Sequence, residues 1–168
     1  MYSVNVPVPG RVSQIAADCW PLLVDFEGIR DRHTLVVKRF GTRSPDEYGA
    51  LEREVRETLV GTPPFDARIT GVDAFFDPPS GASPVVYLTV ESPGLLALHD
   101  RLVDRFGAVS GLEGEEYTPH VTLARGADHE AVDRLLDVEI EPTTWTVTNL
   151  VFWDAWREAT VTTISLPA

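Results

Sequence analysis

The order of the predicted secondary-structure elements repeats once along the chain. In the first half, the spacing of apolar residues predicts alternating strands and helices over residues 2–8, 11–24, 31–40, 44–59 and 65–76. The second half gives the same order over residues 84–90, 92–106, 120–124, 128–137 and 145–153, followed by one more strand at 160–166. A duplicated unit places equivalent residues about a pseudo-twofold axis. We therefore expect strands from the two repeats to face each other across a cleft.

The length of the chain, 168 residues with 43% hydrophobic residues, fits one domain that can bury a core. We expect one domain over residues 1–168 with two pseudo-symmetric lobes, about 1–80 and 81–168. The single cysteine, Cys19, excludes an internal disulfide and fits a reducing compartment. The N-terminal residues show no signal-peptide pattern, and no apolar run reaches membrane-spanning length. These features predict a cytoplasmic protein without a membrane partner.

The charge of the chain is strongly negative overall but locally positive. The sequence has 26 acidic and 14 basic residues, a net charge of -12, and Lys38 is its only lysine. This composition is what we expect of a halophilic protein from a salt-loaded cytoplasm, and it repels polyanions in general. Residues 30–43 nevertheless hold four arginines and Lys38 against one acid, Asp31. This basic segment is a candidate anion site that includes Lys38, or alternatively a strand edge protected against aggregation.

Two predicted strands begin with a histidine, in RHTLVVKRF (residues 32–40) and in YTPHVTLARG (residues 117–126). Two imidazoles that face each other across a cleft can act as base and acid in phosphoester hydrolysis without a metal. In a strand, the hydroxyl of Thr122 lies on the same face as His120 and can donate to a phosphoryl oxygen. A bend at the strand end would direct Arg125 toward the same phosphate.

The string PHVTLAR, preceded by Tyr117, resembles the second signature motif, His-x-Thr-x-x-Arg, of the 2H phosphoesterase superfamily. Within it, the chain is similar to the 2'-5' RNA ligase or RNA 2',3'-cyclic phosphodiesterase family. The resemblance implies a bilobed α+β fold with two mainly antiparallel sheets around a central cleft. It also implies metal-independent chemistry on cyclic phosphate ends of RNA or related nucleotides, with no cofactor. The residues assigned to this site are His33, His120 and Thr122 in catalysis, and Arg125, Phe40, Thr34, Lys38 and Tyr117 in substrate binding.

The first motif departs from the family pattern, because Leu35 stands where a threonine or serine is expected. We align the motif on His33, which leaves Phe40 where such families often place an aromatic residue. A regular strand then puts His33 and Leu35 on the cleft face and directs Thr34 away from it. A β-bulge would instead turn Thr34 inward. The other register, matched on Thr34, would place Arg32 at the catalytic position, and an arginine is no base near neutral pH.

Several alternatives remain open at the level of sequence. His99 and His129 lie among charged residues on predicted helices, so we expect both at the surface. The four histidines show no metal-ligand spacing, so we expect no metal site. The main prediction is a monomeric cyclic phosphodiesterase. The alternatives are a catalytically impaired protein that binds nucleotides or RNA ends, a 2'-5' RNA ligase, and a structural or interaction protein.

Overall fold

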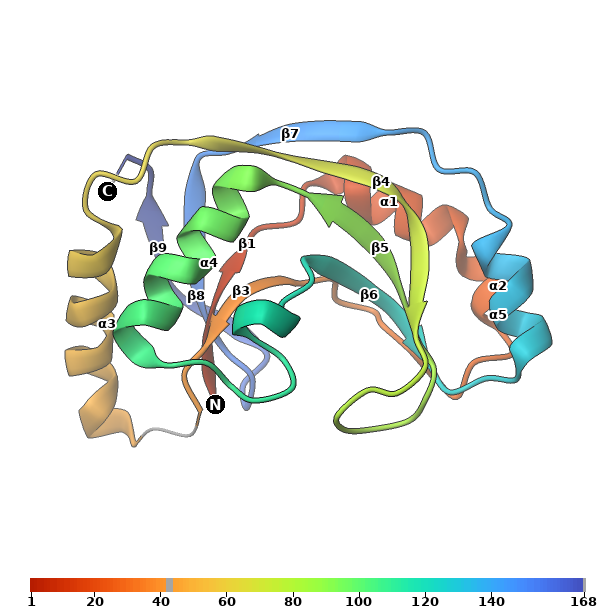
Figure 1. The fold of residues 1–168 in the computed structure, drawn as a ribbon, viewed down its shortest axis with the longest axis horizontal. Coiled ribbons are helices and arrows are strands. Elements are labelled where there is room, and N and C mark those ends of the chain that lie inside the picture. Colours follow the sequence, from red (N-terminus) through yellow and green to blue (C-terminus); the bar gives the residue numbers. More distant parts are fainter. Residues whose placement is uncertain (42–43, 168) are drawn as a thin grey trace.

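The computed structural model describes residues 1–41 and 44–167. Within this part, the chain forms two antiparallel sheets, which confirms the predicted α+β class (Figure 1). The first sheet has the strand order β3 (Leu35–Arg39), β1 (Tyr2–Val6), β8 (Asn149–Asp154) and β9 (Ala159–Ser165). The second sheet has the order β2 (Gly28–Ile29), β6 (His120–Arg125), β5 (Val85–Glu91), β4 (Phe65–Phe75) and β7 (Thr143–Val147). Arg43 of the basic segment lies outside the described residues.

The helices gather at the two ends of the molecule. Figure 1 shows α3 (Pro45–Leu59) and α4 (Pro93–Phe106) beside the first sheet, and α1 (Gly10–Asp18), α2 (Trp20–Leu23) and α5 (His129–Leu136) at the opposite end. Helix α4 contacts β3 as well as α3, while α5 contacts α2 and β4. Among the described residues, no helix is both long and apolar enough to cross a membrane.

The starts of three helices follow from their capping residues. The Ser44 N–H donates to Glu47 Oε2 over 2.8 Å at the start of α3, which is half of a capping box. The Ser92 hydroxyl accepts from the Leu95 N–H before α4, and Asp128 caps α5 in the same way. Because these caps satisfy N–H groups that have no partner inside a helix, the helix starts could be read from the sequence.

The structure corrects two expectations about topology. Residues 145–153 were predicted as one strand, but the chain crosses from the second sheet to the first at Thr148, so β7 and β8 are separate strands. Trp145 is a buried residue of β7 in the second sheet, and Phe152 is a buried residue of β8 in the first sheet. Each sheet also takes strands from both halves of the sequence. The lobes are therefore not residues 1–80 and 81–168.

Strands β3 and β6 each contain a β-bulge, and the two bulges lie at equivalent positions of the two repeats. Along β1, Asn5 pairs with Val36 and Val4 pairs with Lys38, so Val37 is an extra residue in β3. Along β5, Tyr87 pairs with Thr122 and Val86 with Ala124, which makes Leu123 the extra residue in β6. Such β-bulges change the face toward which the following side chains point. Thr34, Val36 and Arg39 of the first repeat thus correspond to His120, Thr122 and Arg125 of the second.

A buried ion pair ties the segment before β6 to β3. Lys38 Nζ lies 2.7 Å from Glu113 Oε2, and the two side chains are 2% and 0% exposed. Glu113 also accepts hydrogen bonds from the backbone N–H groups of Arg39 and Val109, over 2.7 and 2.9 Å. A buried charge with this many partners is satisfied, but the loss of one partner leaves the other uncompensated.

We expect Glu113→Gln to lower the free energy of unfolding by about 3–5 kcal/mol, because it leaves the Lys38 ammonium buried without a counter-charge. Urea denaturation at neutral pH measures the change. The matched control is Glu54→Gln, which breaks the exposed pair with Arg105 and should cost at most about 1 kcal/mol. Equal losses in the two variants would contradict the stabilising role of the buried pair.

Candidate functional site

A cleft of about 660 Å³ lies between β3 of the first sheet and β6 of the second. Its walls include both sets of equivalent residues, with further walls from β1, from the 77–80 loop after β4 and from the segment before β6. The equivalent side chains that line the cleft are Thr34, Val36, Arg39, His120, Thr122 and Arg125. The structure thus brings together five residues assigned from the sequence, because Tyr117 lines the same cleft as Thr34, His120, Thr122 and Arg125.

The predicted orientation of the first motif is wrong. Leu35 and Val37 are completely buried in the core, whereas Thr34 and Val36 line the cleft. The bulge at Val37 then lets Arg39 return to the cleft face. Leu35 is therefore not the position at which the cleft lacks a hydroxyl. That position is Val36, the equivalent of Thr122, and the Thr34 hydroxyl lies in the cleft.

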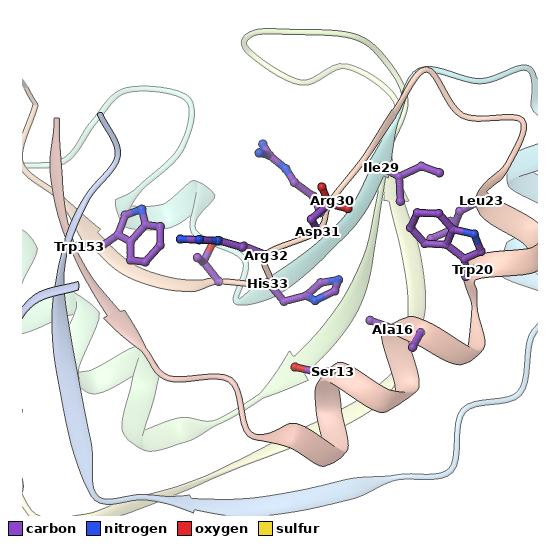
Figure 2. Close-up of a pocket in the computed structure, with 12 residues that line it drawn as sticks. Ser13, Ala16, Trp20, Leu23, Ile29, Arg30, Asp31, Arg32, His33 and Trp153 are labelled. Carbon is purple, nitrogen blue, oxygen red and sulfur yellow. The ribbon is translucent and has the colours of Figure 1, made fainter. Parts of the chain in front are cut away.

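His33 lies in a second cavity rather than among the residues that line the cleft with His120. Figure 2 shows its imidazole directed toward the helix side of that cavity, while Arg32 extends in the opposite direction toward Trp153. Arg32 donates a hydrogen bond to the Glu158 carbonyl. The position equivalent to His120 in the first repeat is Thr34, so neither His33 nor Arg32 occupies it.

Two more residues assigned to substrate binding lie in the interior. Phe40 is 7% exposed and packs edge-on against Phe106, with ring centroids 5.1 Å apart. Lys38 points to the core side of β3, because the bulge places it there, and it pairs with Glu113. Neither side chain lines the cleft, so the assignment of both to substrate binding is corrected.

His120 is held in one tautomer. Its Nδ1 lies 2.6 Å from the Thr118 carbonyl oxygen, which can only accept, so Nδ1 carries a proton and Nε2 keeps its lone pair. The rings of Phe75 and Tyr87 flank the imidazole, each with its centroid 5.2 Å away. Burial lowers the pKa of His120, the positive charges of Arg39 and Arg125 lower it further, and the bond to Thr118 opposes both. The imidazole is therefore neutral near pH 7 and can accept a proton.

The arginines of the cleft repel one another. Arg125 donates from Nη1 to the Ser80 carbonyl over 3.0 Å, and its Nε is buried without a hydrogen-bond partner. Burial lowers the pKa of Arg125, as do the nearby charges of Arg30 and Arg39. Burial also lowers the pKa of Arg39, although Glu113 opposes this. Clustered guanidinium groups with an unused donor are suited to bind an anion.

Tyr117 lines the cleft and is held in place by a buried histidine, His99. Its hydroxyl donates to the Val36 carbonyl over 2.7 Å, and burial raises the pKa of Tyr117. Its ring stacks on His99 with centroids 3.7 Å apart. His99 was predicted at the surface but is 1% exposed, because Nδ1 bonds to the Val37 carbonyl and Nε2 accepts from the Gly114 N–H. Both rings are thereby locked, and Tyr117 shapes the site without a free proton to donate.

Sequence reasoning placed Arg39 in the basic segment without naming it as a site residue, and it assigned no role to Asn5. Both residues line the cleft. Asn5 is 2% exposed and its Oδ1 has no hydrogen-bond partner. A signal was present in the first strand, YSVNVPV, where Ser3 and Asn5 alternate with valines. In the part of the chain that the structure describes, no group of three or more His, Cys, Asp or Glu residues is placed to hold a metal ion.

Comparison with known proteins agrees with this arrangement. A curated RNA 2',3'-cyclic phosphodiesterase of Methanothermobacter thermautotrophicus is 31% identical over 103 residues, which are 61% of this chain and 55% of the relative. The match thus spans about half the length of that relative.

Two solved structures show the same fold. Escherichia coli LigT, complexed with 3'-AMP, superposes with a TM-score of 0.72 at 18% identity, covering 99% of this chain and 98% of LigT. TT0787 of Thermus thermophilus superposes with a TM-score of 0.69 at 19% identity, covering 98% and 97%. The family model described as the 2'-5' RNA ligase superfamily matches residues 26–158. The chain, with its histidine motif on β6 inside a cleft between two antiparallel sheets, belongs to the 2'-5' RNA ligase superfamily.

Proposed function

We propose that the protein hydrolyses 2',3'-cyclic phosphate ends of RNA or related nucleotides, with His120 as its general base. The observation that carries this proposal is the free Nε2 of a neutral His120 in a cleft lined by four arginines. The curated relative, named an RNA 2',3'-cyclic phosphodiesterase, supports the reaction class. The LigT structure that holds 3'-AMP supports a nucleotide phosphate as the ligand.

The first step is the attack of water on the cyclic phosphorus. His120 Nε2 takes a proton from this water as the new P–O bond forms. The Thr122 hydroxyl and the guanidinium groups of Arg39 and Arg125 donate to the phosphoryl oxygens on which charge accumulates. Their effect is largest in the transition state, because the developing negative charge relieves their mutual repulsion.

The second step, the departure of the ribose oxygen, has no imidazole acid to assist it. Of the residues that the structure describes, His120 is the one histidine that lines the cleft, and Thr34 holds the equivalent position. A threonine hydroxyl donates a hydrogen bond but does not release its proton near neutral pH. The ribose oxygen therefore takes its proton from a second water as the P–O bond breaks, and the hydroxide that this leaves takes up the proton held by His120, which restores the neutral imidazole. A missing acid costs about 10²- to 10⁴-fold, so we expect slow turnover.

Two related functions use the same cleft. If a 5'-hydroxyl replaces water as the attacking group, His120 would take its proton and the product would be a joined RNA. Alternatively, the threonine at position 34 favours a protein that binds cyclic phosphate ends without turning them over. Chromatographic analysis of the products distinguishes hydrolysis, ligation and binding alone.

We expect His120→Ala to lower kcat for a 2',3'-cyclic mononucleotide by about 10²- to 10⁴-fold, because no other imidazole in the cleft replaces it. Circular dichroism monitors the fold. His129→Ala is the matched control, since His129 is exposed on α5 and stacks on Phe76 outside the cleft. Unchanged turnover in His120→Ala would rule out the proposed base.

We expect kcat/KM to rise with pH in one step and then to stay level. The base works only when neutral, so activity is lost as pH falls through the pKa of His120, which lies below its ordinary value of 6.5. A pair of imidazoles would instead give a bell-shaped profile, because the acid would be lost at higher pH. A falling limb near neutral pH would contradict the one-histidine mechanism.

We expect Thr34→His to increase kcat by about 10²-fold, the lower end of the effect of a general acid, because it places an imidazole opposite His120. The same variant should acquire the falling limb in its pH profile. Thr34→Asn, which brings hydrogen-bonding groups but no titratable one, is the control and should show neither effect. A gain in Thr34→Asn as well would attribute the change to binding rather than to proton transfer.

A further inference from the structure

A second cavity of about 530 Å³ continues the cleft toward α1 and α2. Its volume is in the range of small-molecule sites. Figure 2 shows its contributors, with Ser13 and Ala16 on α1, Trp20 and Leu23 on α2, and Trp153 on the far side. Residues that line both cavities are Ile29, Arg30, Asp31, Arg32, Thr34 and Trp153. The two cavities therefore form one continuous surface, with Thr34 at the junction.

The helix side of the second cavity offers a face for stacking. Trp20 is 47% exposed and its indole borders the cavity beside Leu23, which is buried (Figure 2). His33 extends from the opposite wall toward this side. An exposed indole over an apolar floor is suited to stack a nucleobase, whichever base it is. The cavity of His33 thus has the lining of a base site rather than of a second proton-transfer site.

The junction between the cavities is positively charged. Arg30 and Arg32 flank Asp31 there, in a protein whose net charge is -12. The charge of Arg30 also lowers the pKa of Arg125, so Arg30 acts on the phosphate end of the cleft. Figure 2 shows that both guanidinium groups extend away from Trp20. Positive groups that lie between a phosphate site and an aromatic side chain can contact the backbone that links two nucleotides.

We propose that the second cavity binds the nucleoside that precedes the cyclic-phosphate-bearing nucleotide of an RNA strand. The linking phosphodiester lies at the junction near Arg30 and Arg32, and the preceding base stacks on Trp20. This inference rests on the proposed function. It assigns the substrate class as RNA ends of two or more nucleotides, in preference to cyclic mononucleotides.

The test compares adenosine 2',3'-cyclic phosphate with a dinucleotide, in which a second adenosine is joined to its 5' side by a 3'-5' phosphodiester. We expect the unmodified protein to have the higher kcat/KM for the dinucleotide. Trp20→Ala should lower the ratio of kcat/KM for the dinucleotide to kcat/KM for the mononucleotide by about 5- to 150-fold, the range for the loss of one base stack. Trp156→Ala is the matched control, because Trp156 is 84% exposed and lines neither cavity. It should leave the ratio unchanged.

A second variant and a binding measurement separate the possible failures. Ala17→Glu places a carboxylate at the exposed helix face of the cavity and should lower the same ratio. It tests the site independently if Trp20→Ala fails to fold. Calorimetry with 3'-AMP and with the diadenosine ending in a 3'-phosphate tests the cavity without turnover. If both substrates are hydrolysed at a ratio that neither variant alters, the second site is refuted and the proposed function stands. Tighter dinucleotide binding that is lost in both variants, without any hydrolysis, would refute the function and support the site.

Discussion

The two bulges at Val37 and Leu123 are the constraint on which the site depends. A strand alternates its side chains strictly, so residues two apart share a face and residues five apart do not. The extra residue in β3 and in β6 changes this count and brings each terminal arginine, Arg39 and Arg125, back to the cleft. Without the bulges, these two guanidinium groups would point into the core and the cleft would lose two of the four arginines that line it.

The charge in the cleft also determines the state of His120. Its pKa is lowered by burial and by the two arginines, while the Thr118 carbonyl holds the proton on Nδ1. One arrangement of groups thus attracts a phosphate and keeps the imidazole ready to accept a proton. When an anion binds, part of the arginine charge is neutralised, so the basicity of His120 rises where the reaction needs it.

Much of the second repeat could be predicted from sequence, and less of the first. In β6, the polar residues His120, Thr122 and Arg125 are spaced by two and then by three positions, and the longer spacing coincides with the bulge. The motif therefore identified the cleft face correctly. In β3, polarity is misleading. Val36 lines the cleft, whereas Lys38 is buried because its partner Glu113 comes from a segment 75 residues away. A pairing at that distance leaves no local pattern, and so the register on His33 and Leu35 was wrong. The change of sheet at Thr148 has no glycine or proline to mark it. It shows only as a shift of the buried residues from odd positions, Trp145 and Val147, to even ones, Leu150 and Phe152, which the prediction of one strand overlooked.

The buried pair of Lys38 and Glu113 responds to dissolved salt differently from the ion pairs at the surface. Dissolved ions screen charges that water reaches, so exposed pairs such as Arg105–Glu54 weaken as ionic strength rises. The interior pair is shielded from those ions, and its attraction persists in brine. Glu113 also accepts hydrogen bonds from the backbone of Arg39 and of Val109. The segment that contains Tyr117 therefore stays attached to β3 at salt concentrations that weaken the ion pairs on the surface of the protein.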